Sequence, residues 1–93
     1  METQAGKLSM DPAWDEFSAI CRQDFVGCEF QEALLKVCGG NEDIAWAVYF
    51  HCRGDAIAWT RRSVPALGGK TPASLIEAGR GDEVRACLWS MPC

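Results

Sequence analysis

The sequence lacks several features that mark exported, membrane-bound or catalytic proteins. Its 93 residues include a single histidine, and its six cysteines form no C-x-x-C pair. No stretch approaches the roughly 20 apolar residues that a transmembrane helix needs. Residues 1–10 hold one lysine and no apolar run, so they do not read as a signal peptide. The sequence therefore predicts a cytoplasmic protein that is not anchored in a membrane.

The cysteines stand at irregular intervals, unlike those of a disulfide scaffold or a zinc site. Four of them, Cys21, Cys38, Cys52 and Cys87, fall on the apolar faces of predicted helices. A reduced thiol in such a place behaves as a small hydrophobic group. We expect reduced cysteines in the core, no bound metal or cofactor, and an exposed thiol at Cys93.

Apolar residues make up 48% of the chain and include four Trp and four Phe. This is enough hydrophobic surface for a core that needs neither disulfides nor metals. A chain of this length is expected to form one domain, because neither half alone would bury a sufficient core. Residues 1–10 show no periodicity and are predicted to be a flexible tail.

The first half of the chain, residues 11–53, contains three helical patterns with apolar residues three or four positions apart. The proline after Asp11 is typical of a first helical turn, and a Gly-Gly pair follows the second pattern. The run 45–50 also fits a strand, but the cap and acidic turn before it favour a helix. The predicted helices cover residues 12–22, residues 30–38, and a segment capped by Asn41 and closed by Gly54.

The second half, residues 54–93, predicts three short helices around an ordered loop. In the loop 65–72, proline fixes φ and two glycines permit positive φ, while Leu67 is a lone apolar anchor for the core. The predicted helix starts are Asp55, Thr71-Pro72 and Asp82. The whole chain is therefore predicted to be all-α, a single compact domain of about six short helices in which the two halves pack together.

Part of the second half resembles the C-terminal, toxin-binding domain of Xre/MbcA/ParS antitoxins. The resemblance covers about residues 54–91 and is carried by the ordered pattern W…PALGGKTP…L…G.G…V…L. Thr60 departs from the leucine that is usual after the tryptophan in that family, and residues 1–53 do not match its N-terminal DNA-binding region. The matching positions are Gly54-Asp55, Ala58-Trp59, the loop 65–72, Leu75, Gly79, Gly81, Val84 and Leu88.

In that family the domain binds a RES-type toxin, an enzyme that attacks NAD, and neutralises it by occluding or approaching its active-site cleft. The resemblance implies an inhibitor that acts by contact. A stiff loop loses little entropy on binding, and cations at its rim would steer association with an acidic surface. Turn chemistry alone also explains the loop residues Pro65, Gly68, Gly69, Thr71 and Pro72. The expected partner-binding residues are Trp59, Arg61, Arg62, Leu67, Lys70, Arg80, Arg85 and Trp89.

The sequence shows no catalytic constellation, and we expect the protein not to be an enzyme. His51 and Cys52 are adjacent in the sequence, but consecutive side chains on a helix diverge by about 100° and do not pair as base and nucleophile. His51 is expected to be a core or interface residue.

Two other functions stay open at this stage. A phage or mobile element would be able to use the same fold against a host defence complex such as a CRISPR effector. Residues 33–62 also faintly resemble a Fis-type helix-turn-helix protein, with 55–62 as recognition helix, which would make the chain a DNA-binding regulator. The net charge of −4 disfavours nucleic acid and favours a protein partner. An exposed aromatic such as Trp46 or Trp89 would also suit a homodimer contact.

Overall fold

The computed structural model describes residues 11–91, which fold into six α-helices and two short 3-10 turns. The predicted all-α class is confirmed, and the only β feature within residues 11–91 is a single bridge between Val64 and Lys70. None of these helices is long and apolar enough to cross a membrane. The elements are α1 (Asp11–Phe25), α2 (Gln31–Val37), α3 (Glu42–Cys52), η1 (Arg53–Asp55), α4 (Ala56–Thr60), η2 (Pro65–Leu67), α5 (Pro72–Glu77) and α6 (Gly81–Ser90).

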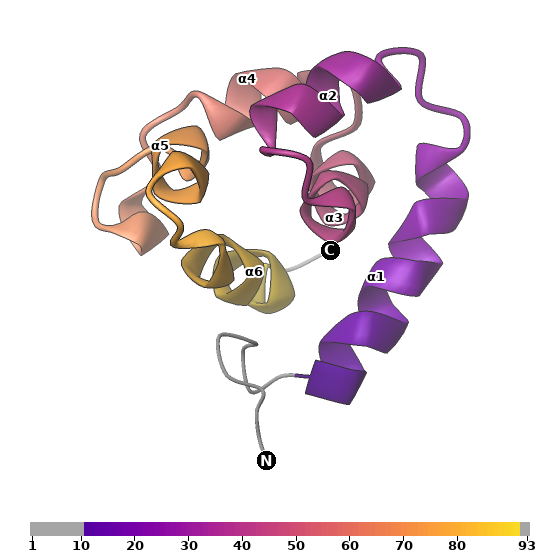
Figure 1. Cartoon of the computed structure of the whole chain (residues 1–93), viewed down its shortest axis with the longest axis horizontal. Helices are drawn as coiled ribbons and strands as arrows, with labels where there is room; N and C mark the ends of the chain where they lie inside the picture. The colour runs from indigo at the N-terminus through magenta and orange to yellow at the C-terminus, as the bar shows by residue number, and fades with distance from the viewer. Residues whose placement is uncertain (1–10, 92–93) are drawn as a thin grey trace.

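Helix α3 lies at the centre of the fold and contacts α1, α4 and α6 (Figure 1). Ile44, Ala45, Ala47 and Val48 are all fully buried, so a wide stripe of this helix faces other helices. Its two buried alanines allow neighbouring backbones to approach closely. The run 45–50 is therefore helical, as the capping pattern predicted.

Two predicted helix boundaries are wrong for identifiable reasons. Helix α1 continues three residues beyond the predicted end at residue 22, because Phe25 is buried in the core and extends the last turn. The side-chain amide of Gln31 donates to the Phe25 carbonyl at 2.9 Å, which satisfies an acceptor at that helix end. Helix α6 begins at Gly81 with Arg80 as N-cap, so Asp82 lies inside the first turn and is not the cap.

The N-caps of the other predicted helix starts differ in their chemistry. The Thr71 hydroxyl accepts a hydrogen bond from the Ser74 amide at 3.1 Å, as a side-chain cap should. Asn41 and Asp55 occupy the N-cap positions of α3 and α4 without any side-chain cap bond. The side-chain amide of Asn41 instead donates to the Cys38 carbonyl at 2.7 Å, which satisfies an acceptor at the end of α2.

The end of α3 also departs from the prediction that Gly54 would close it. The helix ends at Cys52, and Arg53 takes the positive φ of 51° that glycine usually provides. Its guanidinium compensates by contacting the rings of Tyr49 and Phe50 and by pairing with Asp24 of α1 at 3.2 Å.

The core is continuous across both halves of the chain. Cys21, Cys28 and Cys38 lie buried within it, whereas Cys52 and Cys87 are half-buried at its edge. The predicted tail, residues 1–10, and Cys93 lie outside the described residues. The largest fully buried apolar side chains are Trp14, Leu34, Ile44, Val48, Leu75, Val84 and Leu88.

Candidate partner-binding site

The loop between α4 and α5 is a tightly hydrogen-bonded turn. The Val64 amide donates to the Lys70 carbonyl at 3.0 Å, and the Gly69 amide donates to the Val64 carbonyl at 3.0 Å. Gly68 and Gly69 have φ of 67° and 80°, a region that residues with a Cβ enter only at a cost. These bonds hold η2 as a stiff, closed loop, in agreement with the ordered loop that the sequence predicted.

Leu67 joins this loop to the rest of the protein. Its side chain is buried, as predicted for an apolar anchor, whereas the two residues before it, Pro65 and Ala66, are exposed. Pro72 opens α5 at the other end of the loop and is also fully buried. The loop is thus fixed at two points to the core, with an exposed ridge between them.

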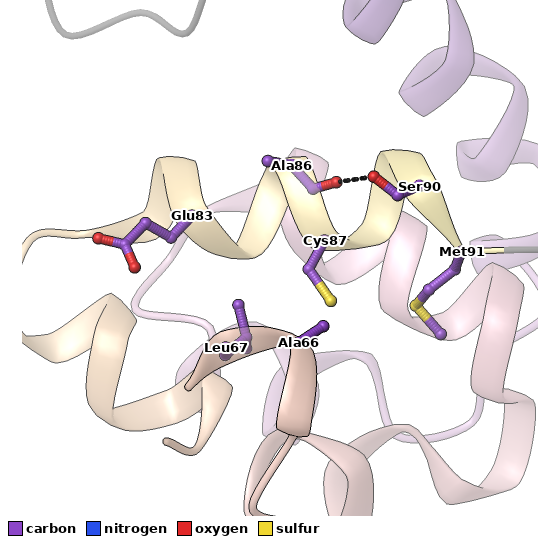
Figure 2. Close-up of a pocket in the computed structure, with 7 residues that line it drawn as sticks. All are labelled: Ala66, Leu67, Glu83, Ala86, Cys87, Ser90 and Met91. Atoms are coloured by element: carbon purple, nitrogen blue, oxygen red, sulfur yellow. Dashed lines mark hydrogen bonds between the residues drawn. The ribbon is translucent and has the colours of Figure 1, made fainter. Parts of the chain in front are cut away.

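A groove of about 510 Å³ runs between η2 and α6 (Figure 2). Figure 2 shows the Cys87 side chain pointing from α6 toward η2, with Glu83 at one end of the row of α6 side chains and Met91 at the other. Only one charged residue is among those that line it. The lining residues are Ala66, Leu67, Glu83, Ala86, Cys87, Ser90 and Met91.

The groove exists because small side chains stand where larger ones would close the gap. Val84 and Leu88 of α6 are fully buried and pin the helix to the core. Ala86 and Cys87 of the same helix are short, partly buried residues that line the groove. The result is a concave surface with an apolar floor, the kind of site that receives an apolar side chain of another molecule.

Two other hollows are more polar and are lined mainly by residues of α1 and α3 and the segments next to them. One, beside α1 and α3, is lined by the charged residues Asp15, Glu42, Asp43 and Arg85. The other includes Arg22 and Glu42 among its lining residues. Seating an apolar side chain in either would desolvate charges, which costs free energy unless the charges stay paired. The groove between η2 and α6 is the better apolar binding site.

Three cations surround the neck of the loop, where the chain enters and leaves it. Arg61 and Arg62 directly follow α4. The bridge between Val64 and Lys70 brings Lys70 close to these two residues in the fold. All three side chains are exposed, and none forms an ion pair within residues 11–91. We call Arg61, Arg62 and Lys70 the basic neck.

The other two predicted rim cations are engaged within the protein. Arg80 pairs with Glu83 at 2.6 Å on the exposed start of α6. Arg85 is partly buried and binds Asp43 and Asp82 at 2.7 and 2.8 Å. Hydrogen bonds from Arg85 lower the pKa of Asp43, although burial opposes this, and the bonds to Asp43 raise the pKa of Arg85. Arg85 is therefore committed to holding α6 on α3.

The two predicted tryptophans lie away from the groove. Trp59 is buried in the hydrophobic core. Trp89 is 45% exposed, but it packs edge-on against Phe17 of α1, with ring centroids 5.6 Å apart. The structure brings Leu67, Lys70, Arg61 and Arg62 to one region and leaves Trp89 on another.

Sequence reasoning missed most of the groove floor. The sequence places Cys87 on an apolar helix face, whereas in the structure Cys87 and Met91 lie half-buried at the edge of the core. Ala66 and Ala86 carried no signal, because an alanine on a helix is ordinarily unremarkable. Small residues that line a groove between two elements become informative only once the elements are placed in space.

Burial and hydrogen bonding constrain several reactive side chains of the described residues. Burial raises the pKa of the Cys38 thiol to about 12, and burial raises that of Cys52 to about 11, so both are protonated at neutral pH. The Nε2 atom of His51 lies 3.1 Å from the Leu88 carbonyl and is occupied by that bond. No group of three His, Cys, Asp or Glu side chains in residues 11–91 is placed to hold a metal ion.

Comparison with known proteins adds no relative to these observations. No protein-family model, no curated protein and no solved structure matches the chain.

Proposed function

We propose that this protein is a non-enzymatic, antitoxin-like inhibitor that binds a partner enzyme through the groove between η2 and α6. The observation that carries the proposal is the groove itself, an apolar, concave surface that is built by a stiff loop and a pinned helix. The loop 65–72 and α6 are also the segments in which the sequence resembles the toxin-binding domain of Xre/MbcA/ParS antitoxins. By that resemblance, the partner is a RES-type toxin that consumes NAD in the cytoplasm.

The physical basis of such an inhibitor is a surface that is already ordered before it binds. The hydrogen bonds across η2 and the burial of Leu67 fix the loop in advance, so little conformational entropy remains to be lost. An apolar anchor from the partner would gain most of its binding free energy in the groove, as anchors in protein interfaces do.

A protein partner fits the surface better than DNA does. Helix α4, the recognition helix of the helix-turn-helix interpretation, has five residues, and Ala56, Trp59 and Thr60 are buried. A recognition helix needs several exposed side chains that reach base edges and phosphates. This helix leaves too few to read a major groove.

The proposal is tested by filling the groove without changing its charge. The double variant Ala66→Gln plus Ala86→Gln places two neutral amide side chains over the groove, and glutamine is compatible with the helix. Co-expression of the wild-type chain with a RES-type toxin encoded beside it should restore growth and cellular NAD. The groove variant should bind the toxin at least about tenfold more weakly and fail to restore either.

A matched control separates loss of binding from loss of folding. Ala19→Gln plus Ala33→Gln makes the same chemical change at two exposed helical positions of α1 and α2, far in sequence from the groove. This control should rescue as the wild type does, and both double variants should keep the helical circular dichroism spectrum. Absence of rescue by the wild type, or equal rescue by the groove variant, would refute the proposal.

A further inference from the structure

The basic neck adjoins the groove through the hydrogen bonds of the loop. The Lys70 amide donates to the carbonyl of Leu67, which lines the groove, at 3.2 Å, and Lys70 also bridges Val64. Arg61 and Arg62 precede Val64 by three residues or fewer. Backbone contacts therefore bring the three residues of the basic neck close to η2, just outside the residues that line the groove.

The charges around the groove are not balanced. At the α6 end, Glu83 is paired with Arg80, so that end is close to neutral. At the η2 end, the basic neck has no ion pair within the described residues. Asp55 is the nearby acidic residue, since both Asp55 and Arg62 affect the pKa of Cys52. An exposed cluster of like charges is destabilised by self-repulsion and gains from an anionic partner. The surface combines an apolar slot with unneutralised positive charge at one side.

We propose that the groove binds a peptide segment of the partner protein that carries both an apolar side chain and several carboxylates. The apolar side chain would contact Leu67, and the carboxylates would lie at the basic neck. This inference rests on the proposed function and adds the chemistry of the partner's contact. The apolar anchor supplies affinity, and the carboxylates supply orientation and a faster association.

The same cations do not favour a nucleic acid in this place. Three phosphate contacts would give only a modest affinity that falls steeply with salt, and a phosphate backbone would leave the adjoining apolar floor uncovered. An acidic peptide uses both parts of the surface at once.

The inference is tested on the isotope-labelled full chain with three synthetic peptides of equal length. The first peptide has leucines at helical spacing and glutamates between them. The second peptide has lysine in place of each glutamate, and the third has serine in place of each leucine. A short duplex DNA serves as a fourth probe. The glutamate–leucine peptide should shift the amide resonances of Ala66, Leu67, Ala86 and Cys87, and the other three probes should leave them in place.

Charge reversal supplies a matched pair of variants. Lys70 and Lys36 are both exposed lysines, but Lys36 lies on α2 and outside the groove. Lys70→Glu should weaken binding of the glutamate–leucine peptide by about fivefold to tenfold, whereas Lys36→Glu should change it by less than about twofold. Raising the salt concentration should remove most of this difference, because exposed charges are then screened.

The outcomes distinguish this inference from the function on which it rests. The acidic-segment inference would be overturned if Lys70→Glu and Lys36→Glu had equal effects, or if the lysine peptide bound. It would also be overturned if only the duplex DNA bound, or if no groove amide shifted. If Lys70→Glu rescues cells from the toxin as well as the wild type while the groove variant does not, the inhibitor proposal stands and this inference fails. If the acidic peptide binds as expected but no rescue occurs, the inference about the segment stands and the toxin proposal fails.

Discussion

His51 shows how one side chain can be fixed by an aromatic environment. Its ring packs against Phe17 and Phe50, with ring centroids 6.0 and 5.3 Å away. Because the Leu88 carbonyl accepts hydrogen bonds and cannot donate, Nε2 must carry the proton that joins it to the end of α6. Burial lowers the pKa of His51 below its ordinary value of 6.5, and the bond to Leu88 only partly opposes this. The neutral ring is the form that the fold accepts.

This histidine should therefore make stability depend on pH. Below pH 6.5 the unfolded chain binds a proton at His51 more readily than the folded protein does, so the free energy of unfolding should fall as the pH drops through 6.5. His51→Gln should abolish this fall, because glutamine does not titrate. Urea denaturation of both proteins at a series of pH values from about 7.5 to about 5 measures the effect. An equally steep fall in the variant would show that another group is responsible.

At the scale of elements, the turn between α2 and α3 packs tightly against a side chain of α5. The Gly39 amide donates to Lys36 and the Gly40 amide donates to Leu35, at 3.0 and 2.9 Å, which is the Schellman pattern of a helix end. Both glycines have positive φ, of 65° and 81°. A Cβ at Gly39 would meet Cγ2 of Ile76 in α5 at 3.0 Å, whereas a Cβ at Gly40 would meet nothing within 4 Å.

The two glycines should therefore differ in their tolerance of alanine. Gly40→Ala has only the backbone strain and should lower the free energy of unfolding by about 1 kcal/mol. Gly39→Ala adds a forced displacement of Ile76 and should lower it by about 2 to 3 kcal/mol. Chemical denaturation of both variants gives the comparison, and equal losses would mean that α5 shifts freely away from the turn.

Elements could be predicted where the chain itself supplies the signal. Thr71 is followed by proline and caps α5 as expected, because the cap and the fixed φ act within a few residues. The prediction of Asp82 as N-cap was wrong, because its carboxylate pairs with Arg85 within α6 and the N-cap is Arg80. The end of α1 depends on the burial of Phe25 among other helices, which no local pattern reveals.

For the whole molecule, the all-α architecture followed from the spacing of apolar residues, whereas the candidate site did not. The sequence directed attention to the loop 65–72 and Leu67, but the floor of the groove depends on how far α6 stands from η2. That distance is set by long-range contacts, including one between Arg85 of α6 and Asp43 of α3, which are 42 positions apart. Arg85 was expected on the binding surface for its charge, and its role is revealed only by its partner.

The network around Asp43 links three helices and so connects the two halves of the chain. The Asp43 carboxylate accepts from Arg85 Nε at 2.7 Å and from Arg85 Nη2 at 3.2 Å, and it also accepts from the indole Nε1 of Trp14 at 2.8 Å. The side chains of Arg85 and Asp43 are only 17% and 25% exposed. An ion pair that is bidentate and partly shielded from water contributes more than an exposed pair.

Comparing Arg80, the N-cap of α6, with Arg85 in the middle of that helix isolates this contribution. Arg85→Met keeps the hydrocarbon part of the side chain but leaves Asp43 partly buried without its cation, so we expect the free energy of unfolding to fall by about 2 to 3 kcal/mol. Arg80→Met breaks the exposed pair with Glu83, whose side chains are 50% and 46% exposed, and should cost at most about 0.5 kcal/mol. Denaturant titrations at neutral pH give both values, and a cost for Arg80→Met that equals that of Arg85→Met would contradict the special role of the Asp43 network.

Because α6 forms one wall of the groove, Arg85→Met should also weaken partner binding in proportion to the loosening of that helix, whereas Arg80→Met should leave the groove wall in place.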